Sequence, residues 1–387
     1  MSLNLKATLV AALCVASLTA HAQQKPPLKV GFMLPYTGTY ASLGQMIESG
    51  FKLYVQEQGG KLGGRELQYF KVDDESEPSK ATDNVNKLIK RDQVDVLVGT
   101  VHSGVALAMA RAAKENNTLL IVPNAGADAI TGPLCAPNIV RSSFSNWQPG
   151  YAAGVIASQK GHKRAMTITW NYAAGAETVK GFTEAFEKGG GKVLKDLTVP
   201  FPNVEFQALL TEIAAQKPDV VFAFFAGGGA VKFVKDYAAA GLNKTVPLVA
   251  SGFLTDGTLE AQGDSAQGIL TALHYADNLD TPRNNAFRKS FALTYKTNAD
   301  VYAVQGYDAA QILAAGLNAV KGDLTQRDAL TAAMRKTSVD SPRGKFTLSA
   351  AGNPVQDIYM REAKGKYNES RGVAVKALAD PARGCKL

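Results

Sequence analysis

The chain has 387 residues, of which 46% are hydrophobic, and carries a formal net charge of +8. This length exceeds the roughly 250 to 300 residues at which a single hydrophobic core stops growing, so two lobes are expected. Lysine and arginine alternate with aspartate and glutamate and form no concentrated basic block, which argues against a nucleic-acid-binding protein.

The first segment has the features of a secretory signal peptide. Lys6 precedes a mostly apolar run, residues 7–20, that ends in the small-residue pattern Ala-His-Ala. The run is shorter than the roughly 20 residues needed to cross a bilayer as a helix. We therefore expect residues 1–22 to be cleaved as a signal peptide and the mature chain, starting at Gln23, to reach the periplasm as a soluble protein.

Short apolar strands and longer amphipathic helices alternate in the first third of the chain. Pro78 fits the first turn of one helix, where its missing N–H is not needed. The period of the apolar residues predicts strands at 28–35, 66–74, 94–100 and 118–123, and helices at 41–58, 78–92 and 104–117. This repeated βα pattern, with right-handed crossovers, predicts a parallel sheet covered by helices on both faces.

The same pattern restarts after a segment rich in Ser, Asn and Pro that ends near Gly150. The predicted strands lie at 164–170, 191–199, 219–225, 246–251 and 268–275, and the helices between them at 175–189, 205–217 and 229–241. A second parallel sheet is therefore expected, with the join to the first near residues 141–147.

In the last part of the chain, strands and helices no longer alternate. Residues 284–320 are mostly helical with no strand between, and residues 325–337 form one more predicted helix. Residues 344–367 are predicted to form a hairpin with a Gly-Asn turn. The extra helices need a surface to cover, and we expect them to pack on the first lobe.

Cysteine usage fits an oxidising compartment. Cys14 falls in the signal segment, which leaves Cys135 and Cys385 as an even pair. We predict a disulfide that ties the C-terminal tail to the loop around Cys135; two unrelated buried thiols are the alternative.

Candidate ligand-binding loops follow from a general property of open parallel sheets, in which ligands bind outside the carboxyl ends of the strands. Four loops qualify, at residues 35–44, 99–105, 123–128 and 170–175. In the second loop, the Ser103 hydroxyl and the backbone amides at the start of a helix can hold a carboxylate; the alternative is that Ser103 only caps the helix.

Aromatic residues at or just after the predicted strand ends suggest a clamp around the ligand. For each of them, packing in the core is the alternative role. The candidates are Tyr40, Trp147, Trp170, Tyr172, Phe225 and Phe253.

Signatures of catalysis are weak or missing. The glycine-rich segment at 227–229 has Lys232 where a dinucleotide loop needs its third glycine. The neighbouring His102 and Ser103 lack the G-x-S-x-G motif of hydrolases, and His162 and His274 have no partner at metal-ligand spacing. No catalytic residue, cofactor or metal is therefore predicted.

Several segments, in their order and spacing, resemble the periplasmic leucine/isoleucine/valine-binding receptors of ABC transporters. The resemblance runs from Leu28 to about Tyr367 and rests on "KVGFMLPYTGTYASLGQ", "LGGRELQ", "VDVLVGTVHSGVALAMA", "IVPNAGA", "IVRSSFSNWQPGYAAG" and "GYDAAQIL". It implies the type I periplasmic binding fold, in which two Rossmann-like lobes with parallel central sheets are joined by three hinge crossovers.

The resemblance also implies a division of the chain. Hinges are expected near Arg141, near His274 and near residues 344–348. The first lobe then comprises residues 23–141 and 276–345, the second residues 142–275 and 346–378, and the tail residues 379–387.

Individual positions take roles from the same resemblance. Ser103 matches the residue whose hydroxyl and amide hold the ligand carboxylate, with His102 beside it, and Asn124 and Gly126 match two contact positions that flank Ala125. Tyr172 is expected to close on the ligand from the second lobe.

Three other positions differ from the amino-acid-binding members. Leu43 stands where an aromatic pocket wall is usual, and Ala174 stands where a tyrosine is often found. Thr255 or Asp256 lies near the place where an acidic side chain receives the ligand ammonium.

The implied function is the substrate-binding component of an ABC importer: a monomer that is not an enzyme, whose partners are permease subunits in the inner membrane. The ligand is expected to be an amino acid of the branched-chain type or a related small carboxylate. If Thr255 replaces the acid, the receptor would prefer acids without an α-amino group, such as aromatic carboxylates, because a buried ammonium needs a carboxylate partner. A ligand-sensing protein of the same fold is a further alternative.

Overall fold

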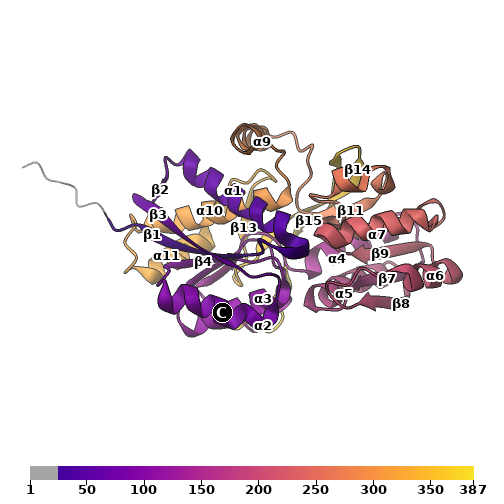
Figure 1. Cartoon of the computed structure of the whole chain (residues 1–387), viewed down its shortest axis with the longest axis horizontal. Helices are drawn as coiled ribbons and strands as arrows, with labels where there is room; N and C mark the ends of the chain where they lie inside the picture. Colours follow the sequence, from indigo (N-terminus) through magenta and orange to yellow (C-terminus); the bar gives the residue numbers. More distant parts are fainter. Residues whose placement is uncertain (1–24) are drawn as a thin grey trace, which may run out of the picture.

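A computed structural model describes residues 25–387 as two α/β lobes that lie side by side along the long axis of the molecule (Figure 1). The predicted signal peptide, its cleavage site and Cys14 lie outside the described residues. Within residues 25–387, none of the helices combines the length and the hydropathy that a membrane crossing requires.

The first lobe is built on a six-stranded sheet with the strand order β2-β3-β1-β4-β5-β6. Neighbouring strands from β3 to β6 run parallel, and only the short β2 is antiparallel to its neighbour. The bounds are β1 (Leu28–Leu34), β2 (Lys61–Leu62), β3 (Arg65–Asp73), β4 (Val96–Gly99), β5 (Leu119–Val122) and β6 (Ile139–Arg141). Five of these strands place their carboxyl ends at one edge of the sheet.

Helices cover both faces of this sheet, as the βα pattern predicts. Their bounds are α1 (Ala41–Glu57), which follows η1 (Gly38–Tyr40); α2 (Pro78–Asn86), continued by η2 (Lys87–Arg91); and α3 (Ser103–Glu115), with η3 (Asp128–Ile130) after β5. Pro78 occupies the first turn of α2, as predicted. The α1 face packs on β1 through Phe51, whose ring meets Phe32 edge-on at 5.2 Å between centroids.

The second lobe contains a nine-stranded sheet in the order β12-β13-β14-β11-β10-β9-β7-β8, with β15 paired to β14. The strands are β7 (Arg164–Trp170), β8 (Lys192–Val199), β9 (Val220–Phe224), β10 (Leu248–Ser251), β11 (Leu270–Leu273), β12 (Ser338–Val339), β13 (Phe346–Leu348), β14 (Pro354–Lys364) and β15 (Tyr367–Leu378). The helices are α4 (Trp147–Gln159), α5 (Ala173–Lys188), α6 (Gln207–Gln216), α7 (Gly227–Ala239) and α8 (Leu259–Gln262), with the short turns η4 (Leu242–Lys244), η5 (Gly252–Leu254) and η6 (Gly263–Ala266).

The central strands of this sheet, from β8 to β11, are parallel, whereas β14 is antiparallel to both β11 and β15. The mixed edge differs from the wholly parallel sheet expected from the βα pattern. Short turns join β13 to β14 and β14 to β15, so these pairs are antiparallel, and β14 lies against β11 in the opposite direction. The Gly-Asn turn between β13 and β14 is present, with Gly352 at φ +82°, but the strand β15 was not predicted.

The helices α9 (Pro282–Tyr295), α10 (Val301–Ala319) and α11 (Arg327–Lys336) follow the second sheet in sequence, and α10 and α11 pack on the first lobe, as predicted. The α1 and α10 backbones touch. A Cβ on Gly50 would lie 1.9 Å from the Ala303 carbonyl oxygen, and one on Gly306 would lie 1.9 Å from that of Ile47. Glycine is therefore required where these two helices cross.

The chain passes between the lobes after β6, again between β11 and α9, and a third time between α11 and the last strands of the second sheet. A disulfide joins Cys135 to Cys385, with 5.6 Å between the Cα atoms. The tail therefore leads from β15 of the second sheet back to the first lobe, where the C-terminus lies beside α3 (Figure 1).

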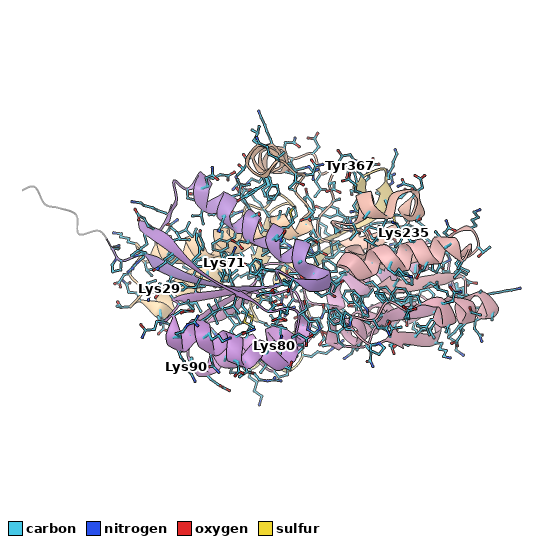
Figure 2. The ribbon with its side chains drawn as sticks, in the orientation of Figure 1. Lys29, Lys71, Lys80, Lys90, Lys235 and Tyr367 are labelled. Atoms are coloured by element: carbon cyan, nitrogen blue, oxygen red, sulfur yellow. A yellow bond between two sulfur atoms is a disulfide. The ribbon has the colours of Figure 1, made fainter. Side chains whose placement is uncertain are left out.

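Charged side chains cover the surface without gathering in one block. Figure 2 shows the lysines 29, 71, 80 and 90 spread over different elements of the first lobe, and Lys235 far from them on the second.

Candidate ligand-binding site

A narrow cavity lies between the lobes at the carboxyl ends of the parallel strands, where open α/β sheets bind ligands. We call it the aromatic cavity. It is lined by Tyr40, Leu43, Val101, Ser103, Asn124, Gly126, Phe144, Asn146, Tyr172, Ala174, Phe224, Ala226, Phe253 and Tyr302. About 20 Å³ is open to the centre of a water molecule, which is room for little more than one water. A larger ligand therefore enters only when the lobes or the rings move apart.

The polar end of the aromatic cavity is formed where β4 leads into α3. His102 caps this helix, since its Nδ1 accepts a hydrogen bond from the Gly104 N–H at 3.1 Å. Ser103 is the first helical residue, and its Oγ accepts from Asn146 Nδ2 at 3.2 Å. The alternative that Ser103 is only the helix cap is thus wrong. Its hydroxyl lies in the cavity, beside the positive end of a 13-residue helix.

The loop after β5 forms the adjacent wall. The Asn124 side chain is fixed by a 2.8 Å hydrogen bond from its Nδ2 to Gln305 Oε1 of α10. A Cβ on Gly126 would lie 2.2 Å from Asn146 Oδ1 and 2.6 Å from the Phe144 ring. Glycine is needed here because the backbone passes directly against the side chains of the next loop.

Aromatic rings from both lobes form the rest of the cavity wall. The hydroxyls of Tyr40 and Tyr172 lie 3.1 Å apart and join the first lobe to the second. Phe253 packs against Phe144 at 4.7 Å and against Phe224 at 6.4 Å between ring centroids. These flat apolar walls are suited to a planar ligand.

Three buried ionisable groups, two in this wall and one next to it, are neutral near pH 7. Burial lowers the pKa of His102 to about 4, and the ring stacks on Tyr172 at 4.5 Å between centroids. Burial also raises the pKa of Tyr40 and Tyr172 above the ordinary value for tyrosine. These side chains therefore bring no formal charge to the cavity, and a bound carboxylate would be the charged group there.

Seven of the predicted ligand-contact residues line the aromatic cavity: Tyr40, Leu43, Ser103, Asn124, Gly126, Tyr172 and Phe253. The other four lie elsewhere. His102 stacks on Tyr172, Ala125 of the loop after β5 is buried in the core of the first lobe, and Phe225 packs in the core of the second lobe against Trp170 and Phe206. Thr255 faces a different cavity.

The tryptophans of the proposed clamp also have core roles. Trp170 is fully buried and donates from Nε1 to the Asn203 carbonyl at 2.8 Å. Trp147 donates from Nε1 to Glu184 at 2.9 Å and packs on Tyr151. Neither ring lines the aromatic cavity.

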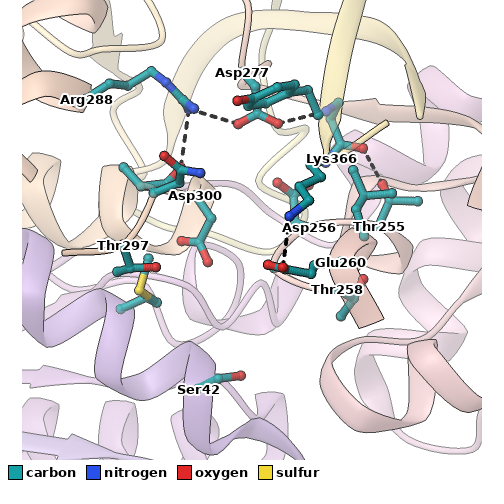
Figure 3. A pocket seen from close by; sticks show the side chains of 17 residues that line it. Ser42, Thr255, Asp256, Thr258, Glu260, Asp277, Arg288, Thr297, Asp300 and Lys366 are labelled. Atoms are coloured by element: carbon teal, nitrogen blue, oxygen red, sulfur yellow. Dashed lines mark hydrogen bonds and ion pairs between the residues drawn. The ribbon is translucent and has the colours of Figure 1, made fainter. Parts of the chain in front are cut away.

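The predicted ammonium partners face a second space, which we call the polar cavity. It has a volume of about 290 Å³ and lies between α1, the loop after β10, the start of α10 and the β14–β15 turn (Figure 3). The Thr255 hydroxyl is bonded to Asn368 Oδ1 at 2.5 Å. Asp256 forms an ion pair with Arg361, with 2.6 Å between Oδ2 and Nη2, and both side chains are buried.

No aspartate or glutamate belongs to the described residues that line the aromatic cavity. Asp256 is already committed to Arg361, and Glu177 approaches only through Asn146, whose Nδ2 donates to its Oε2 at 2.7 Å. The cavity therefore offers donors for a carboxylate but no carboxylate for an ammonium group.

Six further residues line the cavity although the sequence pattern does not predict them there: Val101, Phe144, Asn146, Phe224, Ala226 and Tyr302. The strand period contains a signal for Phe224, because successive side chains point to opposite faces and only one of Phe224 and Phe225 can face the cavity. Phe144 and Asn146 follow β6, whose three residues give too short a signal. Tyr302 lies on α10, far away in sequence from every other lining residue.

Comparison with known proteins agrees with this architecture. A family model described as periplasmic binding protein matches residues 27–368. A curated Leu/Ile/Val-binding protein homolog 6 from Brucella melitensis is 29% identical over 367 residues, covering 92% of this chain and 93% of that protein.

Solved structures are more similar. A solute-binding protein of an ABC transporter from R. palustris, in complex with benzoate, is 56% identical and superimposes with a TM-score of 0.91, covering 93% of this chain and 100% of that one. Another, from Rhodopseudomonas palustris BisB5 in complex with 3,4-dihydroxybenzoic acid, is 31% identical with a TM-score of 0.86, over 92% and 99% of the two chains.

Proposed function

Because the chain belongs to the periplasmic binding protein family and is a substrate-binding component of an ABC importer, we propose that its ligand is an aromatic carboxylate of the benzoate type. The protein binds this acid in the periplasm without altering it and delivers it to the permease subunits in the inner membrane. It acts as a monomer.

The proposal rests on one observation: the aromatic cavity offers hydrogen-bond donors to an anion but, among its described residues, no acidic side chain to a cation. Ser103 and the start of α3 offer donors to an anion, six aromatic rings line the walls, and no acidic side chain is among the described lining residues. An amino acid would bury its ammonium group without a partner, which costs several kcal/mol. The benzoate complex of the 56% identical protein supports the same ligand class.

Binding is proposed to proceed by closure of the lobes. The open first lobe holds the carboxylate at Ser103 and the loop at 124–126, and the second lobe then brings Tyr172, Phe224 and Phe253 onto the ring. Closure turns about the crossings near Arg141, near His274 and near residues 344–348. The ligand favours the closed form because only that form contacts both of its faces.

A thermal-shift and calorimetry series tests the ligand class. We expect benzoate to raise the melting temperature of the mature protein, since a ligand at 100 times its Kd stabilises by about 2.7 kcal/mol. Leucine, isoleucine and valine should leave it unchanged, and benzoate recovered after incubation should have its original mass. A shift with leucine and none with benzoate would show that the cavity accommodates an ammonium group and that the proposal is wrong.

A further inference from the structure

Tyr302 brings to the aromatic cavity a hydroxyl that has no hydrogen-bond partner among the described residues. The side chain is only 1% exposed, and its ring lies 6.1 Å from that of Phe253 between centroids. The other hydroxyls of the cavity are paired: Tyr40 with Tyr172, and Ser103 with Asn146. A buried hydroxyl without a partner is unfavourable, so this one points to a polar atom supplied by the ligand.

A chain of contacts leads from Ser103, the proposed position of the carboxylate, to Tyr302. Ser103 is bonded to Asn146 in the loop after β6, and Phe144 of the same loop packs against Phe253. Phe253 in turn contacts Tyr302. The two phenylalanine rings therefore connect a polar end at Ser103 with a second polar group at Tyr302.

An anion near Tyr302 would find no free cation among the described residues, because Arg361 is already paired with Asp256. Asp300 caps α10 two residues before Tyr302, and its Oδ2 lies 3.1 Å from where a Cβ on Gly257 would be, with the Tyr302 ring 3.7 Å from the same point. Asp300 and Asp256 both line the polar cavity (Figure 3). Burial, and then these two carboxyl groups, hold the pKa of Tyr302 well above 10, so its hydroxyl is neutral. A neutral ligand group fits here better than a carboxylate.

We infer that Tyr302 is a specificity-determining residue that hydrogen-bonds to a hydroxyl on the aromatic ring of the ligand. The preferred substrates are then hydroxylated benzoates, with the carboxylate at Ser103 and the ring hydroxyl at Tyr302 Oη. This inference rests on the proposed function and refines it, since unsubstituted benzoate bound between these walls would leave Tyr302 without a partner.

Calorimetry at pH 8 with benzoate, 3-hydroxybenzoate and 4-hydroxybenzoate tests the inference on the wild type, Tyr302→Phe and Tyr307→Phe. Tyr307 is the matched control, because it lies on the same helix but its hydroxyl is bonded to Glu57 outside the cavity. We expect one of the hydroxybenzoates to bind the wild type about tenfold more tightly than benzoate. Tyr302→Phe should remove this advantage and leave the Kd for benzoate within about twofold, whereas Tyr307→Phe should retain it.

Other outcomes overturn the inference in distinguishable ways. If Tyr302→Phe weakens benzoate as much as the hydroxybenzoates, Tyr302 contacts the carboxylate or only supports the fold. If the wild type binds benzoate at least as tightly as both hydroxybenzoates, the refinement is wrong while the proposed function stands. If none of the three acids binds, both are wrong.

Discussion

Two features of Ser103 suit it to an anion: its hydroxyl and its position at the start of a helix. It is the first residue of α3, 1% exposed, and it shares the Asn146 side chain with Glu177 of the second lobe. A carboxylate placed here would meet a hydroxyl, an amide side chain and the positive end of the helix together. The neighbouring His102 caps the helix, so the Ser103 hydroxyl is not used for capping.

Replacing Ser103 with Ala should weaken benzoate binding by about tenfold or more, because a hydrogen bond to a charged group contributes about 1.5 to 3 kcal/mol. Calorimetry gives the Kd. Ser158→Ala, on α4 away from the cavity, is the control and should leave the Kd unchanged. Equal affinity of the Ser103→Ala variant would place the carboxylate elsewhere in the cavity.

Elements of the two lobes meet at a pair of carboxyl groups beside the ligand site. Glu177 of α5 accepts hydrogen bonds from the backbone N–H of Asp128, at 3.0 Å, and from Asn146. The Asp128 carboxylate accepts from the Trp147 N–H at 3.2 Å. Arg141 and Asp380 are the other charged groups that face this pair. Closing the lobes therefore buries two acids near each other.

This pair predicts that ligand affinity depends on pH. Burial, followed by repulsion from Glu177 and Asp380, raises the pKa of Asp128 to about 7, and burial also raises the pKa of Glu177. In open lobes both acids would be hydrated and ionised near neutral pH, with values of about 4. Closure then takes up a proton below about pH 7, so affinity should rise as pH falls from 8 to 6, by several-fold and at most about tenfold per pH unit.

Titrating benzoate by calorimetry between pH 6 and 8 measures this dependence. Glu177→Gln should flatten it, because it removes the repelling neighbour of Asp128. Glu187→Gln on the exposed side of the same helix should retain the wild-type slope. A slope that survives in Glu177→Gln would assign the proton to another group.

The whole molecule has a fourth link between its lobes besides the three crossings. The tail after β15 holds Asp380 against Thr131 at 2.8 Å and ends in the disulfide to Cys135 of the first lobe. The two cysteines are 250 positions apart in the sequence, so the bond constrains the unfolded chain strongly. We expect it also to limit how far the second lobe can move away from the first.

Removing the disulfide with Cys135→Ser and Cys385→Ser together should lower the free energy of unfolding by about 2 to 4 kcal/mol, as measured by denaturant titration. Small-angle scattering of the ligand-free variant should show a larger radius of gyration than that of the wild type. Unchanged stability and shape would mean that the tail neither constrains the unfolded chain nor restrains opening.

The sequence alone determined the elements and their order, because apolar periodicity is a local property. The sequence predicts the βα alternation and the helix that starts at Pro78. It also predicts the loops at strand ends that carry Ser103, Asn124 and Tyr172. The strand period also restricts which residues face a site, yet it could not decide between Phe224 and Phe225 without knowing which face each lies on.

Only the tertiary structure decided which side chains share the aromatic cavity. Tyr302 lines the cavity because α10 packs on the first lobe. Asp256 does not line it and forms an ion pair with Arg361 of β14. Both contacts join residues about 50 or more positions apart along the chain, so no local pattern encodes them. The chemistry offered to the ligand is therefore set by packing between distant segments, while the sequence pattern set only the framework that holds it.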